Sequence, residues 1–324
     1  MSVAHHLGRA LPVRSSTLSL RTAVKYSLRI RRIEFFPTTL TIILVPALLL
    51  AGSDAVFGTA TFIAVAVMTR LIIHFGDMVN CLADRDVDAI YKTRLSDAVY
   101  GLGLSNVRWQ IRVTGAAVLA LAAYLAVATR HWDILPLILV ELYFARQYSV
   151  APLHLKGAGA WQIPTLFVII YGLPMLMVAR AFPVDLGWPV LLVIAGFGVS
   201  QVGVIVVNRA EDLPEDEEYG IRTSVLALGL SRAIGVATLM VGLGGAALIA
   251  GVLAMGEPSW GLVPLVAATA WALWHVGGTW LAVRGRPVDA ALKSLRPRAK
   301  LVPVQLAVTG WGAVLAAAFV LANR

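Results

Sequence analysis

Long apolar segments recur along the whole chain and constrain its fold more than any other feature of the sequence. A transmembrane helix needs about 20 mostly apolar residues. Only 14% of the residues are charged and 59% are hydrophobic, whereas soluble domains have about a quarter of charged residues. We therefore predict an all-α polytopic membrane protein with nine transmembrane helices. The nine segments are residues 35–53, 56–76, 107–129, 134–150, 161–181, 187–208, 232–255, 260–283 and 301–322.

The first thirty residues differ from the rest, because they are basic and polar. They lack a short apolar core followed by a small-residue cleavage site, so we predict no cleaved signal peptide. We expect residues 1–30 to be a cytoplasmic basic segment and residues 31–324 to form a single transmembrane domain. The only cysteine, Cys81, excludes an intramolecular disulfide and a zinc site built from several cysteines.

Lysines and arginines gather in alternate connections between the apolar segments. If the amino terminus is cytoplasmic, all but three of the 27 fall on the cytoplasmic side, and the exceptions are Arg130, Arg180 and Arg324. This asymmetry follows the positive-inside rule. We attribute the net charge of +9 to membrane topology rather than to nucleic-acid binding, and expect the basic stretch at residues 284–300 to contact membrane lipids. The prediction is an integral membrane protein, placed in the plasma membrane of a bacterium.

A short acidic motif occurs twice, each time at the predicted cytoplasmic end of an apolar segment. Residues 80–88 and 208–216 both read Asn-x-x-x-Asp-x-x-x-Asp, and an arginine follows each copy six residues later. Spacings of four place the polar side chains on one face of a helix, one turn apart. The residues are Asn80, Asp84, Asp88 and Arg94 in the first copy, and Asn208, Asp212, Asp216 and Arg222 in the second.

The duplicated motif predicts a site for magnesium and an organic diphosphate. Magnesium takes oxygen ligands, keeps several waters and commonly joins one or two carboxylates to substrate phosphates. Two facing motifs would surround one hole with four carboxylates and two amide oxygens. A solvated helix end accounts for a single aspartate, but it does not account for the same pattern twice with matching arginines.

These motifs resemble the two signatures of the UbiA superfamily of intramembrane prenyltransferases. The first copy, followed by Lys92, is similar to the first signature, and the second copy, followed by residues 220–229, is similar to the second. Residues 148–157, which read Tyr-Ser-Val-Ala-Pro-Leu-His-Leu-Lys-Gly, resemble the loop between the fourth and fifth helices of the family. Arg32 stands where the family often has an arginine before its first helix. The resemblance covers about residues 30–320.

The resemblance implies a nine-helix bundle with a lipid-facing pocket and two cytoplasmic Asp-rich motifs. It also implies magnesium-dependent transfer of a prenyl group from a polyprenyl diphosphate to a lipophilic acceptor, as in isoprenoid biosynthesis. Tyr148 would lie near the reacting carbon. The implied metal ligands are Asn80, Asp84, Asp88, Asp212 and Asp216, and the implied diphosphate-binding residues are Arg32, Asn80, Lys92, Arg94, Lys156, Asn208 and Arg222.

The chain departs from the family pattern in its first motif. Cys81 stands where the family usually has a second aspartate, and we interpret it as a helix-packing residue. Residues 94–98, Arg-Leu-Ser-Asp-Ala, replace the usual end of the first signature. Because this segment is expected to cover the pocket, the acceptor or the product could be unusual for the family.

Two other functions compete with prenyl transfer. A membrane terpene cyclase would use the same diphosphate site, with a double bond of the substrate itself attacking the cation. A transporter would use membrane carboxylates as an ion path, but such sites lie near the bilayer midplane rather than at helix ends.

Several polar residues inside the apolar segments also require an interpretation. Asp77 either forms a structural charge pair with Arg70 or has a functional role. Gln201 precedes Asn208 by seven residues and shares its helical face, which makes it a candidate for the pocket lining. Glu141 contacts the acceptor, acts as a base or pairs with Arg146.

Overall fold

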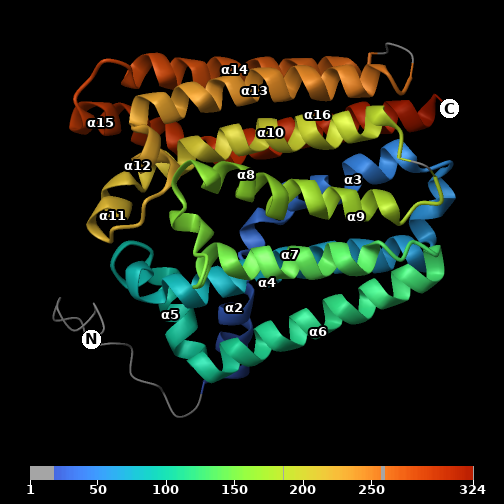
Figure 1. Cartoon of the computed structure of the whole chain (residues 1–324), viewed down its shortest axis with the longest axis horizontal. Coiled ribbons are helices and arrows are strands. Elements are labelled where there is room, and N and C mark those ends of the chain that lie inside the picture. Colours follow the sequence, from blue (N-terminus) through green and yellow to red (C-terminus); the bar gives the residue numbers. More distant parts are fainter. Residues whose placement is uncertain (1–17, 185, 257–259, 324) are drawn as a thin grey trace.

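The computed structural model describes residues 18–184, 186–256 and 260–323 and shows a bundle of long helices (Figure 1). No strand occurs in this part of the chain. Residues 1–17 of the predicted amino-terminal segment lie outside the described residues, and its remainder forms the helix α2 (Leu20–Ile30). The long helices are α3 (Phe36–Leu50), α4 (Ala60–Tyr91), α6 (Leu104–Thr129), α7 (Ile134–Ser149), α10 (Trp188–Glu211), α13 (Leu230–Leu253), α14 (Leu262–Val283) and α16 (Val302–Ala322).

Eight helical stretches in the described ranges are long and apolar enough to cross a membrane. One of them, Gly159–Arg180, is composite, because the π-helical segment η5 (Phe167–Gly172) separates α8 (Gln162–Leu166) from α9 (Leu173–Arg180). The predicted segment 134–150 corresponds to α7, whose 16 residues fall short of the length that a span needs by itself. It still packs between α4, α6 and α9 inside the bundle.

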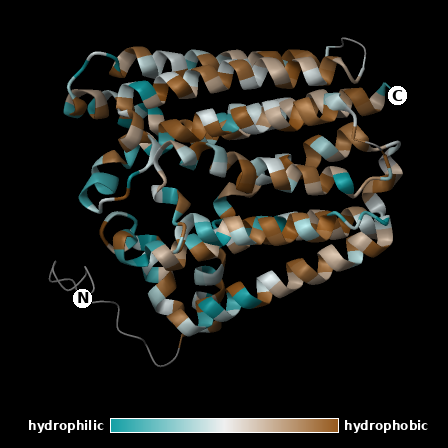
Figure 2. Ribbon diagram, viewed as in Figure 1, coloured by the Kyte–Doolittle hydropathy of each residue, from teal (hydrophilic) through white to brown (hydrophobic). Residues whose placement is uncertain are grey.

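The ends of the bundle differ in polarity. Short helices gather at the left end in Figure 1, and Figure 2 shows that this end carries most of the hydrophilic residues. At the opposite end Arg180 holds Asp133 through two hydrogen bonds of 2.7 and 3.0 Å, which joins the end of α9 to the start of α7. The short helices at the polar end are α5 (Thr93–Leu102), α11 (Leu213–Glu218), α12 (Ser224–Leu228) and α15 (Val288–Ala299).

Glycine allows α10 and α13 to pack closely against each other. A Cβ atom added to Gly196 would lie 2.4 Å from the backbone nitrogen of Leu248, and one added to Gly244 would lie 2.5 Å from that of Ser200. Small residues at a crossing let helix backbones approach, which is a frequent basis of helix association in membranes. This contact holds the apolar part of α10 in place, and α10 leads directly into the second acidic motif.

Candidate functional site

A cavity of about 320 Å³ lies between the two acidic motifs and extends into the bundle. Its polar part is formed by the ends of α4 and α10, by α11 and by the loop that follows α7. Its deeper part is largely apolar and includes Ile72, Ile73, Ile169 and Ile170. The charged and amide side chains that line its polar part are Arg32, Asn80, Asp84, Asp88, Lys92, Lys156, Asn208, Arg209, Asp212, Glu215 and Asp216.

The first motif lies on one continuous helix, as its spacing predicted. α4 begins at Ala60 and continues to Tyr91, and the hydroxyl of its N-cap residue Thr59 accepts a hydrogen bond from the backbone N–H of Phe62. Asn80, Asp84 and Asp88 therefore lie one turn apart on the face that lines the cavity. The amide nitrogen of Asn80 donates to Oδ2 of Asp84 at 2.8 Å, so this amide is oriented by the motif itself.

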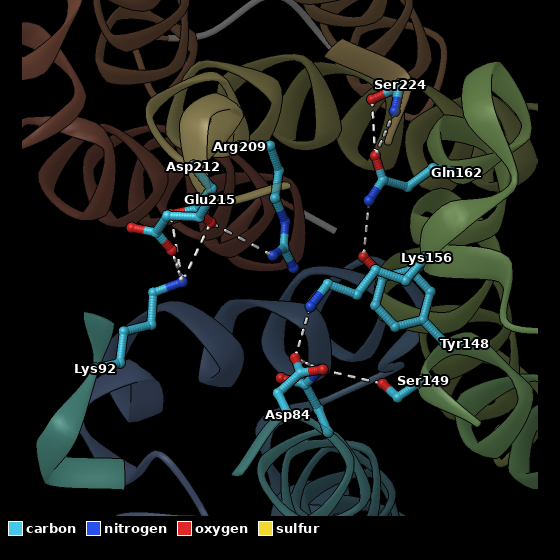
Figure 3. A network of polar contacts seen from close by, with 11 residues as sticks. Asp84, Lys92, Tyr148, Ser149, Lys156, Gln162, Arg209, Asp212, Glu215 and Ser224 are labelled. Atoms are coloured by element: carbon cyan, nitrogen blue, oxygen red, sulfur yellow. Dashed lines mark hydrogen bonds and ion pairs between the residues drawn. The ribbon is translucent and has the colours of Figure 1, made fainter. Parts of the chain in front are cut away.

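A lysine from the loop after α7 forms an ion pair with Asp84 of the first motif. Nζ of Lys156 lies 2.7 Å from Oδ2 of Asp84, and both side chains are mostly buried. The amide nitrogen of Asn80 also donates to the hydroxyl of Ser149 at 3.1 Å, which fixes the end of α7 against α4. Figure 3 shows Asp84, Lys156 and Ser149 close together below Asp212 and Glu215 of the second motif region.

The second motif does not lie on one helix, and our prediction of a single helical face was wrong there. α10 ends at Glu211, Asp212 occupies the junction, and α11 starts at Leu213. Pro214 explains the break, because proline lacks an N–H group and favours the first turn of a new helix. Asp212 and Asp216 nevertheless both line the cavity.

Two groups that the spacing did not indicate also line the cavity here, Arg209 near the end of α10 and Glu215 on α11. Nζ of Lys92, at the end of α4, lies 3.3 Å from both carboxylate oxygens of Asp212 and 3.8 Å from Oε2 of Glu215. Nη1 of Arg209 lies 3.9 Å from Oδ2 of Asp212. Figure 3 shows Lys92 reaching toward this carboxylate pair from the side of the first motif. A lysine that follows the first motif thus pairs with a carboxylate of the second motif across the cavity.

Burial changes the titration of the second motif. It raises the pKa of Glu215 to about 7, an effect that Asp212 and Asp216 reinforce and the Lys92 ammonium opposes. Burial also raises the pKa of Asp216. Both groups therefore hold protons more readily than exposed carboxyl groups when no further cation is present.

Tyr148 is held in the cavity wall by a buried glutamine. Nε2 of Gln162 donates to the hydroxyl oxygen of Tyr148 at 3.3 Å. Oε1 of the same glutamine accepts from the backbone N–H and the hydroxyl of Ser224, at 3.0 and 2.8 Å. Because Gln162 is fully buried, this bridge fixes the tyrosine relative to α12. The sequence motif pointed to Tyr148, whereas nothing in the spacing of residues pointed to Gln162.

The donor set fits magnesium, although the described residues contain no preformed group of three His, Cys, Asp or Glu side chains that could hold a metal. Magnesium commonly uses one or two protein carboxylates, with water and phosphate as the other ligands. Asp84 and Asp212 each already hold the ammonium group of a lysine. The positions of Asp84 and Asp212 are therefore suited to stabilising positive charge, and Asn80, Asp88 and Asp216 line the same cavity.

Two predicted diphosphate ligands, Arg94 and Arg222, are exposed and do not line the cavity. Arg209 and Glu215 do line it, although neither was predicted to be a site residue. The only signal for Glu215 was Pro214, which shifts the residues after it relative to the face of α10.

The other polar residues within the spans have distinct environments. Gln201 donates to the carbonyl of Leu306 and to Thr309, so it packs between α10 and α16 rather than lining the cavity. Cys81 is buried among apolar residues near Ile30, in agreement with the packing interpretation.

The charge pair between Arg70 and Asp77 does not form as a direct contact. Arg70 instead donates to Thr39 and lies over the ring of Phe36. Asp77 lines the cavity. Glu141 also forms no ion pair with Arg146, and neither of its carboxylate oxygens has a hydrogen-bond partner.

The fold and the site define a polytopic helical membrane protein with a charged cavity at one end of its bundle. The chain belongs to the UbiA prenyltransferase family, whose family model matches residues 38–296. Sequence comparison with curated proteins finds no match.

Solved structures of the same fold cover almost the whole chain. A structure of digeranylgeranylglyceryl phosphate synthase has a TM-score of 0.65 at 16% identity and covers 92% of this chain and 99% of its own. A UbiA homologue from Archaeoglobus fulgidus, bound to GPP and Mg2+, has a TM-score of 0.60 at 14% identity and covers 89% and 99%. The apo form of a UbiA homologue from Aeropyrum pernix K1 has a TM-score of 0.60 at 20% identity and covers 87% and 97%. At these identities the likeness concerns the fold alone.

Proposed function

We propose that this chain is a magnesium-dependent prenyltransferase that moves a prenyl group from a polyprenyl diphosphate to a lipophilic acceptor. The observation that carries the proposal is a single cavity with two cation-binding carboxylate motifs at one end and an apolar interior at the other. A prenyl diphosphate has the same polarity, with a highly charged head and a hydrocarbon tail. A solved structure of the Archaeoglobus fulgidus homologue holds GPP together with Mg2+.

The side chains of the cavity suit the departure of a diphosphate. Breaking the bond between the allylic carbon and oxygen places negative charge on the leaving group, and preorganised cations stabilise such charge. Lys92 and Lys156 already point at the motifs, and Arg32 and Arg209 line the same cavity. Bound magnesium would add further positive charge at Asp84, Asp88, Asp212 and Asp216, with Asn80 and Asn208 beside it. In this assignment Arg209 has the role that the sequence motif suggested for Arg222.

The reacting carbon next to the diphosphate requires protection from water, because an allylic cation reacts readily with it. The isoleucine-rich part of the cavity provides apolar walls for the prenyl tail. Tyr148 stands between the polar and apolar parts, where the ring that Gln162 fixes would lie beside the reacting carbon. We place the polar end of the bundle at the cytoplasmic face of a bacterial plasma membrane, because the basic residues gather there.

The test is diphosphate release by the purified protein in detergent. We expect release from geranylgeranyl diphosphate to need Mg2+ and to increase when a lipid extract that contains acceptors is added. The prenylated product would be detected by mass spectrometry. Release that persists at an unchanged rate in excess EDTA would contradict the proposal.

Terpene cyclisation is the alternative that one observation favours. Leu95, from the segment that departs from the family signature, lines the cavity and adds apolar surface near the polar motifs. A cyclase would convert geranylgeranyl diphosphate and Mg2+ alone into a hydrocarbon. Formation of a hydrocarbon without an acceptor would therefore replace the transferase assignment by this one.

A further inference from the structure

Glu141 is a fully buried carboxyl group that lines the cavity and has no hydrogen-bond partner. Its exposed fraction is 0%, and both Oε1 and Oε2 lack a partner. Leaving a polar group buried and unpaired is unfavourable, so each such group in a native structure requires an explanation. A ligand that binds in the cavity and pairs with the carboxyl group provides one.

The register between α4 and α7 places Glu141 in the apolar part of the cavity. Asn80 contacts Ser149 with a separation of 69 residues, and Gly76 lies against Ala145 with the same separation. The same offset places Glu141 beside Ile72, which also lines the cavity. Along α7, Glu141 lies two turns, or about 10 Å, before Tyr148 and therefore deeper in the bundle.

A prenyl tail does not account for Glu141. The tail is a hydrocarbon and cannot donate or accept a hydrogen bond, so a tail packed on this carboxyl group would leave it unpaired. Arg146 does not account for it either, because that side chain is exposed. The part of the cavity around Glu141 therefore suits a molecule that is mostly apolar but carries a hydrogen-bonding group.

We infer that Glu141 selects the acceptor by forming a hydrogen bond with a hydroxyl group of an otherwise apolar molecule. A hydroxyl group both donates and accepts, so it can pair with a carboxyl group in either protonation state. The inference rests on the proposed function, and it specifies the acceptor as a hydroxylated lipophile rather than a pure hydrocarbon. Glu141 is thus a specificity-determining residue, distinct from the groups that bind the diphosphate.

The test compares two probes that differ only in a hydroxyl group, 1-naphthol and naphthalene. Their binding to the whole protein in detergent with Mg2+ is followed by their fluorescence. We expect the wild type to prefer 1-naphthol. Glu141→Leu should weaken the binding of 1-naphthol at least tenfold, which corresponds to about 1.4 kcal/mol. It should leave the affinity for naphthalene unchanged. Equal binding of 1-naphthol by Glu141→Leu and wild type would overturn the inference.

Two further variants control the comparison. Glu141→Gln keeps groups that can hydrogen-bond a hydroxyl and should retain 1-naphthol binding within about threefold. Asp289→Leu removes an exposed carboxyl group on α15, outside the cavity, and should bind both probes as the wild type does. If Glu141→Leu does not fold, Glu141→Met tests the same loss of the hydrogen bond, and the same two outcomes apply.

Diphosphate release measured on the same preparations separates the two proposals. A wild type without Mg2+-dependent release would refute the proposed function, whatever Glu141 does. Normal release by all variants, together with unchanged selection of 1-naphthol by Glu141→Leu, would refute only the inference about Glu141. Loss of selection with normal donor KM supports it, because a purely structural role would not distinguish the two probes.

Discussion

Nζ of Lys156 lies 2.7 Å from Oδ2 of Asp84, and this contact joins the loop after α7 to the first acidic motif. The second motif has an equivalent contact, in which Lys92 from the end of α4 meets Asp212 at 3.3 Å. One aspartate of each motif thus forms an ion pair with a lysine from a segment outside that motif. In the proposed function both lysines would bind diphosphate oxygens, and the carboxylates would hold the metal ions.

Replacing Lys156 should impair the binding of the donor. We expect Lys156→Met to lower kcat/KM for the prenyl diphosphate by about 10²–10³, the range seen when one preorganised group at a developing charge is removed. Lys156→Arg keeps the charge and should recover part of the activity. Steady-state kinetics with varied diphosphate concentration provides the measurement.

The matched control for Lys156 is Lys293→Met, because Lys293 is exposed on α15 and should not affect the kinetics. A Lys156→Met variant with the kinetics of the wild type would show that the diphosphate does not use this cation. Thermal unfolding must be followed in parallel, because removing one partner of a mostly buried ion pair also destabilises the fold.

Asp84 and Asp212 should be equally necessary if both motifs belong to one site. Asp84→Asn and Asp212→Asn are each expected to abolish Mg2+-dependent turnover, because each removes a negatively charged oxygen ligand. Both variants should remain folded in detergent, since the substitution keeps the shape of the side chain. Turnover is measured over a series of Mg2+ concentrations.

Asp97→Asn is the control for this pair, because Asp97 is exposed on α5 and lies outside the cavity. It should keep the rate of the wild type. If either motif variant kept a near-normal rate at low Mg2+, the shared site would be wrong.

The contact between Asp133 and Arg180 should make stability depend on pH at the opposite end of the bundle. The hydrogen bonds from the Arg180 guanidinium hold the pKa of Asp133 below its ordinary value, which is about 3.9. A lowered carboxyl pKa contributes stability that is present above the ordinary pKa and is lost as pH falls through the folded-state value.

Asp133→Asn should therefore melt at a lower temperature than the wild type at pH 7, and the difference should shrink as the pH falls below about 3.9. The Asp133 side chain is 46% exposed, so we expect no more than about 1 kcal/mol from such a solvent-screened pair. Thermal unfolding in detergent over this pH range measures it. A difference that stays constant with pH would assign the effect to something other than the charge of Asp133.

The sequence predicted the first motif better than the second for a physical reason. Spacing of four residues is meaningful only while the helix continues, and α4 continues through residues 80–88. In the second copy Pro214 starts a new helix, and Glu215 on that helix lines the cavity although it was not predicted to do so. Arg209 lies before the break, on α10, outside the spacing of four that defined the motif.

The spacing of residues along the chain also did not predict which side chains are buried inside the bundle. Whether Gln201 and Glu141 line a cavity depends on the partner helices, and a periodic pattern along one helix does not specify these. The apolar segments, in contrast, predicted eight of the spans because length and hydrophobicity are properties of a single segment.

The close packing of α10 on α13 predicts that alanine substitutions at two glycines have different effects on the stability of the protein. An added Cβ at Gly196 would lie 2.4 Å from the backbone of α13, which cannot move away as a flexible side chain would. Gly196→Ala should thus destabilise the protein by about 1–3 kcal/mol, as overpacking does. At Gly242 the nearest atom is a side-chain carbon of Leu273 at 3.6 Å, an ordinary contact.

Gly242→Ala should leave stability unchanged or raise it by up to about 1 kcal/mol, because alanine favours a helix over glycine. Thermal unfolding of both variants in the same detergent tests the pair. Equal melting temperatures for the two alanine variants would mean that α10 and α13 do not approach as closely as their glycines allow. The second motif would then lack this support, since α10 carries Asn208 and leads into Asp212.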